Sequence, residues 1–344
     1  MAQLSDTLLQ VAVVTYVVAM LGYLVEYAFG TRGAVARVAV RPARELVAVG
    51  APSAPSQVPH TGPDGPPAPP AGPSGTDSGS VGPASSSVAP RGVPGGAGIV
   101  GVALTVLGLT LHIAVIVTRG LAAERFPLAN MYEFVVALTA VFGIGWLVLL
   151  ARRPSMRPLG LFVAAAMALL LGFASLVLYT AAGPLVPALQ SYWLTIHVTA
   201  AATASGLFLL AFVPAALYLI RAGYDAGKRR FPYPIGRKLP AAETLERLAF
   251  RLHTFAFPIW TLAVICGAIW AEASWGRYWG WDPKETWSFV SWVAYAAYLH
   301  ARATPSVKRT TATWFAVVAW LSMLVNLYVI NFVAVGLHSY ASVD

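Results

Sequence analysis

The sequence predicts an all-α, polytopic membrane protein with about eight transmembrane helices and both termini on the outer face. Of its 344 residues 58% are hydrophobic and only 11% are charged, and the apolar residues fall into long runs. A helix needs about 20 mostly apolar residues to cross a bilayer. We expect spans near residues 8–29, 97–118, 131–151, 159–180, 193–220, 252–272, 286–302 and 311–336.

Residues 1–30 form the first transmembrane helix, and we expect this helix to be retained. Its apolar run is longer than that of a cleaved signal peptide, it has no basic segment before it, and it carries Asp6. Residues 31–96 form a cytoplasmic basic segment followed by a Pro, Gly and Ser-rich linker that has almost nothing to bury, so we expect disorder there. Residues 97–340 hold the other seven spans and a tryptophan-rich outer loop at about 272–286.

The distribution of basic residues sets the predicted orientation. If the first loop is cytoplasmic, all of the 23 Lys and Arg residues lie inside except Arg119, Arg125, Arg277 and Lys284. Positive charge marks the cytoplasmic side of membrane proteins. Membrane insertion therefore explains the net charge of +9, and nucleic acid is not needed as a partner.

The outer loop WGRYWGWDPKETWSF, residues 275–289, crowds aromatic rings around charged groups. The rings belong to Trp275, Tyr278, Trp279, Trp281 and Trp287, and the charged neighbours are Arg277, Asp282, Lys284 and Glu285. One interpretation is an aromatic belt at the membrane interface. A belt, however, spreads its rings over many helix ends, whereas this array suits a large planar ligand with an anionic edge, such as a porphyrin.

Two histidines are predicted to reach the same outer face as this loop. His197 lies in SYWLTIHV near the outer end of one span, and His338 lies in AVGLHSY just past the last span. Two imidazoles beside an aromatic platform are what axial ligation of a heme iron requires. The alternative for each ring alone is an ordinary interface residue.

The other histidines and one polar corner have two interpretations each. His300, at the inner end of a span, is a functional group or a residue that extends to the interface, and His112 within a span is functional or forms an interhelical hydrogen bond. We expect His60 and His253 to be incidental. The corner in RFPLANMYEF either caps a helix through Asn130 or belongs to the outer site; it contains Pro127, Asn130, Tyr132 and Glu133.

The segments FPLANMYEF, SYWLTIHV, the tryptophan loop and GLHSY, in this order, resemble the CcsA/ResC family of cytochrome c biogenesis proteins, over about residues 100–340. This resemblance implies a heme lyase component in which His197 and His338 are the catalytic axial ligands of heme b, and His300 ligates heme at an inner site. The heme-contacting set that we expect is His197, His338, His300, Trp275, Arg277, Tyr278, Trp279, Trp281, Asp282, Lys284 and Trp287. Because carboxylates repel propionates, we expect Lys284 and Arg277 to face them and Asp282 and Glu285 to brace the loop.

The resemblance also implies partners and a place of action. The partners are a ResB/CcsB-type membrane protein, apocytochrome c and membrane lipid, and the active site faces outward from the plasma membrane. The chain has one cysteine, Cys266, which can form neither an internal disulfide nor a Cys-x-x-Cys pair, so any reacting thiols belong to a partner. Alternatives are a heme exporter that serves a chaperone, a bis-histidine electron-transfer protein reacting with quinone, and a transporter of an unrelated anion.

Overall fold

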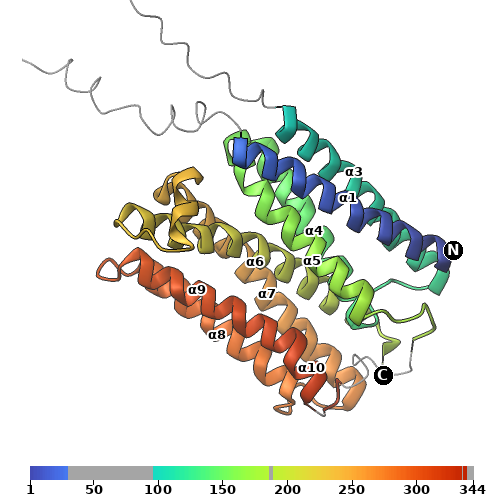
Figure 1. Cartoon of the computed structure of the whole chain (residues 1–344). Coiled ribbons are helices and arrows are strands. Elements are labelled where there is room, and N and C mark those ends of the chain that lie inside the picture. The colour runs from blue at the N-terminus through green and yellow to red at the C-terminus, as the bar shows by residue number, and fades with distance from the viewer. Residues whose placement is uncertain (30–95, 186–188, 335, 339–344) are drawn as a thin grey trace, which may run out of the picture.

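The computed structural model describes residues 1–29, 96–185, 189–334 and 336–338, which form a bundle of helices (Figure 1). The helices of this part of the chain are α1 (Ala2–Phe29), α3 (Gly96–Ala123), α4 (Met131–Arg152), α5 (Gly160–Val177), α6 (Tyr192–Asp225), α7 (Ala242–Trp275), α8 (Pro283–Ala303), α9 (Arg309–Leu324) and α10 (Ile330–Val333). Two short 3-10 helices, η1 (Pro154–Leu159) and η3 (Tyr233–Lys238), precede α5 and α7, and a π-helical turn, η4 (Val325–Val329), joins α9 to α10. The described residues contain no strand.

Seven helical segments among the described residues are long and apolar enough to cross a membrane, so the predicted all-α, polytopic membrane fold is confirmed. The predicted span at 286–302 corresponds to α8, which is 21 residues long but is not among these seven. Its polar residues, which include Lys284, Glu285, Ser288 and Ser291, make it less apolar than its neighbours. The predicted linker at 31–96 lies outside the described residues, except that Gly96 begins α3.

Helix α4 lies between two groups of helices. On one side it packs against α3 and α5, which together hold α1, and on the other side it packs against α6 (Figure 1). Helix α6 in turn packs along α7 and α9, and α8 packs against α7 and α9. The start of α1 and the last described residues lie at the same end of the bundle (Figure 1), as the predicted placement of both termini on one face requires.

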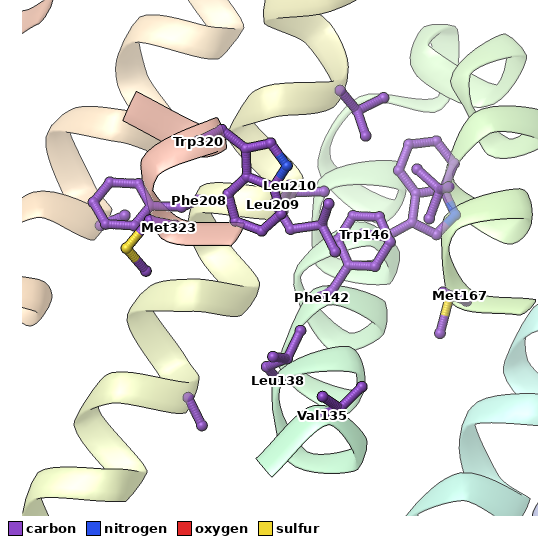
Figure 2. Packing of buried hydrophobic residues seen from close by; sticks show 14 of the residues in the cluster. Val135, Leu138, Phe142, Trp146, Met167, Phe208, Leu209, Leu210, Trp320 and Met323 are labelled. Carbon is purple, nitrogen blue, oxygen red and sulfur yellow. The ribbon is translucent and has the colours of Figure 1, made fainter. Parts of the chain in front are cut away.

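Large side chains fill the interior between these helices. Figure 2 shows Phe142 and Trp146 of α4 beside Leu209 and Leu210 of α6, with Trp320 of α9 close by. Each of these residues is less than a tenth exposed. The resulting core is continuous from α5 to α9, and its close packing fixes the relative positions of these helices.

Gly206 permits the closest approach of α4 and α6, and Gly206→Ala should destabilise the protein. A Cβ at this position would lie 2.5 Å from the carbonyl oxygen of Leu138 and 2.9 Å from Cβ of Val141. Overpacking of this kind costs about 1–3 kcal/mol. The measurement is thermal unfolding of the purified protein in detergent, and we expect a lower Tm. Gly172→Ala in α5 is the matched control, because nothing lies within 4 Å of the Cβ it would add; equal Tm values for the two variants would contradict the prediction.

Candidate functional site

An apolar cavity opens between the N-terminal parts of α4, α6 and α8, the C-terminal half of α7, the end of α9 and the π-helical turn η4. Its volume is about 160 Å³, and a cavity of similar volume is known to hold benzene. A porphyrin is larger than this volume. Tyr278, which lines the cavity, is exposed, so a ligand of that size would extend beyond the cavity beside Tyr278 and Trp279.

His197 lies in this cavity on the second turn of α6. The helix begins where Ser191 accepts a hydrogen bond from the Trp193 N–H at 3.3 Å. The imidazole Nδ1 of His197 lies 2.8 Å from the carbonyl oxygen of Ala263 in α7. Because a carbonyl can only accept, Nδ1 carries the proton and Nε2 keeps the lone pair that a metal would bind. Gly267 makes room for the ring, since a Cβ there would come within 2.7 Å of His197.

His338 is held in the same tautomer by Asp282. Its Nδ1 lies 2.9 Å from Oδ1 of Asp282, and the N–H of the neighbouring Leu337 donates to Oδ2 at 2.8 Å. Burial alone would raise the pKa of Asp282, but the hydrogen bonds from His338 and Leu337 outweigh it and lower this pKa to about 2. Asp282 is thus an ionised acceptor, which fixes the proton on Nδ1 and leaves the lone pair on Nε2, the arrangement typical of imidazoles that bind metals.

Trp270 brings the two histidines together. Its ring is stacked on that of His197, with centroids 6.1 Å apart, and meets that of His338 edge-on at 5.8 Å. Trp275 also contacts His338, at 5.0 Å. The sequence did not single out Trp270, which is buried near the end of α7; its position five residues before Trp275 is the signal that could have found it.

The aromatic residues of the loop divide into three kinds. Tyr278 and Trp279 line the cavity, Trp275 packs against Trp270 and His338, and Trp281 and Trp287 do not line it. The side chain of Trp281 is 66% exposed and its ring meets that of Trp279 edge-on. Its φ is 59°, in the left-handed region, where a non-glycine residue is strained and strain gathers at functional loops.

The charged residues of the loop have different surroundings. Asp282 and Glu285 form a capping box at the start of α8, and Arg277 lies 3.6 Å from Glu285 and does not line the cavity. Lys284 does line it, and its Nζ donates to the backbone carbonyl of Asn326 at 3.0 Å. Withdrawal from water lowers the pKa of Lys284 to about 7. Lys284 is therefore the better placed of the two cations expected to face an anionic ligand edge.

His60 lies outside the described residues, and the other three histidines lie away from the cavity. His300 is exposed near the end of α8, at the other end of that helix from the loop. His112 is buried and its Nε2 lies 3.0 Å from the carbonyl oxygen of Val136, which is the interhelical hydrogen bond of the alternative interpretation. His253 is fully buried against Tyr298, with ring centroids 4.7 Å apart.

Glu133 fixes the polar corner at the start of α4. Its carboxylate accepts from Arg119 Nε at 3.1 Å, from Arg125 Nη1 at 2.8 Å and from the N–H of Ala129 at 2.7 Å. Asn130 caps α4 by accepting the Glu133 N–H at 2.9 Å, and it also lines the cavity. The capping interpretation is therefore confirmed for Asn130, and its position in the cavity wall is compatible with a role in the outer site.

The two histidines suit a metal ion that is already coordinated by a planar ring. Within the described ranges no group of three or more His, Cys, Asp and Glu residues is arranged to hold a metal ion. Two ring nitrogens beside aromatic faces can complete the coordination of an iron already bound in a porphyrin plane. A bare ion would need more protein ligands than these two.

Comparison with known proteins agrees with this arrangement. The model of the family described as "Cytochrome C assembly protein" matches residues 128–338, from the first lining residue of the cavity to His338. A protein of Guillardia theta named cytochrome c biogenesis protein CcsA is 32% identical over 258 residues, which cover 70% of this chain and 85% of the relative. Proteins of the same name from Gloeobacter violaceus and Oryza sativa are 31% and 32% identical and cover 64% and 66% of this chain, and 80% and 81% of their own lengths.

Proposed function

Because the chain belongs to the cytochrome c assembly family, we propose that it is the membrane subunit of a cytochrome c synthase of the system II type. The chain is a multi-pass membrane component of cytochrome c biogenesis. In the proposal it receives heme b, presents it on the outer face of the plasma membrane and supports its attachment to the Cys-x-x-Cys-His segment of apocytochrome c. The observation that carries the proposal is the pair of Nδ1-protonated histidines in contact with one tryptophan at the cavity.

In this function heme is the substrate, and His197 and His338 hold its iron. Asp282 strengthens the donor character of His338 by accepting a hydrogen bond from its Nδ1–H, as carboxylates do behind metal-bound imidazoles. Tyr278 and Trp279 offer their faces to the ring at the mouth of the cavity. The cavity volume of about 160 Å³ is smaller than a porphyrin, so part of the ring would extend beyond the cavity, where a client protein can reach it.

Attachment is an addition of thiols to vinyl groups. Each client cysteine adds its sulfur to one vinyl carbon and its proton to the other, so a C–S bond forms, the C=C bond becomes single and no external oxidant is needed. Cys266 is buried within α7, so the thiols belong to the client. The client histidine then replaces one axial ligand and the product leaves.

The exposure of His300 supports a role for a partner protein. Its side chain is exposed near the end of α8 opposite to the loop, so a group of another protein can reach a ligand bound to it. We assign it to an inner heme site in which a ResB/CcsB-type membrane protein supplies the second imidazole.

The test is the maturation of a reporter in bacteria that lack their own cytochrome c synthase. The full chain and a ResB/CcsB-type partner are expressed with an exported apocytochrome that carries Cys-x-x-Cys-His. Heme should remain on the reporter in a denaturing gel, whereas a reporter with both cysteines replaced by Ala should carry none. If heme purifies with the chain and never becomes covalent, the protein is a heme exporter and the synthase proposal is wrong.

A further inference from the structure

One wall of the cavity is polar, at the place where α8 meets the π-helical turn η4. Lys284 and Ser288 are one helical turn apart on α8, so they share a face, and Asn326 lies in η4; all three line the cavity. Single π-helical turns are frequent at functional sites. The turn places the carbonyl of Asn326 where it accepts a hydrogen bond from Lys284 Nζ at 3.0 Å.

The hydrogen bonds among these three residues leave bonding capacity unused. Nδ2 of Asn326 donates to Oγ of Ser288 at 3.0 Å, and Oγ of Ser288 donates to the carbonyl of Lys284 at 2.8 Å. The Asn326 Oδ1 atom is buried and has no hydrogen-bond partner among the described residues. An ammonium group has three N–H donors, and the contact with Asn326 occupies one of them.

The negative charge of Asp282 partly compensates Lys284, but no carboxylate among the described residues is hydrogen-bonded to its Nζ. Among the described residues that line the cavity, Lys284 alone is a lysine or arginine. Asp282 is bonded to His338, Leu337 and the Lys284 backbone N–H. Glu285 also lines the cavity; its Oε2 accepts from backbone N–H groups and lies near Arg277, and its buried Oε1 has no hydrogen-bond partner among the described residues. A cation withdrawn from water without a hydrogen-bonded counter-charge is costly, and a carboxylate in the cavity would relieve that cost.

We propose that Lys284, Ser288 and Asn326 form a carboxylate subsite that binds the propionate edge of heme and thereby orients the ring. The amide of Asn326 turns so that Ser288 donates to its oxygen and its nitrogen donates to the propionate, beside the Lys284 ammonium. Heme carries its propionates on one edge and its vinyls on the far side of the ring. With the propionates against this wall, the vinyls lie at the open mouth, where thiols reach them.

This inference rests on the proposed function, and a pair of probes separates the two. The full-length protein, purified without heme, is titrated with heme and with heme dimethyl ester, in which both propionates are neutral. Wild type should bind heme about 10- to 100-fold more tightly than the ester, as expected for charge-assisted hydrogen bonds. In Lys284→Met and Asn326→Leu this preference should fall to about twofold or less, while the low-spin absorption bands due to two histidine ligands remain.

Ser322→Ala provides the matched control. Ser322 Oγ donates to Ser291 Oγ at 3.0 Å in the same α8–α9 interface, and neither serine lines the cavity, so this variant should keep the wild-type preference. The inference is overturned if wild type binds both probes equally, or if the Lys284 and Asn326 variants keep its preference. If wild type binds neither probe through its histidines, the proposed function itself fails.

Discussion

His197→Ala and His338→Ala should each remove the low-spin heme spectrum of the purified protein and nearly abolish cytochrome c production. Changes in the residues behind a metal ligand already cost about 10–100-fold, so the loss of a ligand should lower reporter maturation by at least about 100-fold. Imidazole fits the space that each Ala leaves, and adding it should restore the low-spin bands of both variants. The measurements are the reduced absorption spectrum and the amount of covalent reporter.

His112→Gln is the control for this prediction. His112 is buried like a ligand but bonds to the carbonyl of Val136, away from the cavity, so its replacement should leave the heme spectrum unchanged. A spectrum shared by wild type and both Ala variants would mean that the two histidines do not ligate the iron. The tryptophan loop would then be an aromatic belt at the membrane interface.

Glu133→Ala should cause a large loss of stability. The side chains of Arg119 and Glu133 are 2% and 1% exposed, so the change leaves a guanidinium buried without its counter-charge. Breaking a buried pair in this way costs about 3–5 kcal/mol. The measurement is thermal unfolding in detergent. Retained heme should fall as well, because Glu133 accepts the N–H of Ala129, a lining residue.

Glu243→Ala is a matched control, because Glu243 is also a glutamate in the first turn of a long helix and also pairs with an arginine. Its side chain is 72% exposed and that of Arg247 is 62% exposed. Exposed pairs contribute about 1 kcal/mol at most, so this variant should unfold close to wild type. Equal losses in the two variants would show that the buried cluster adds no more stability than a surface pair.

The sequence predicts those features of the fold that depend on residues close together in the chain. The apolar runs give the spanning helices because a bilayer accepts no other backbone arrangement for them. The basic loops place His197 and His338 at one end of the bundle, and both line the cavity there. Asn130 is predicted as a cap because its side chain bonds an N–H only three residues on.

Features that depend on packing between distant segments were not predictable. In the sequence Trp270 is one of many apolar residues of a predicted span. Its importance comes from its contacts with His197 of α6 and with His338. His253 was expected to be incidental at the inner end of a span. Because α7 begins at Ala242, the ring lies within the helix and packs against Phe208 and Tyr298. The position of Asn326 depends on the π-helical turn, which no sequence pattern predicts.

Asp282 has a consequence for genetic work on this protein. One carboxylate bonds the backbone N–H that starts α8, the N–H of Leu337 and the imidazole of His338. Any replacement that removes the hydrogen-bond acceptor of His338 also weakens the start of α8 and the last described turn of the chain. A mutant at this position will therefore score as a folding defect in one screen and as a heme defect in another, although a single side chain causes both phenotypes.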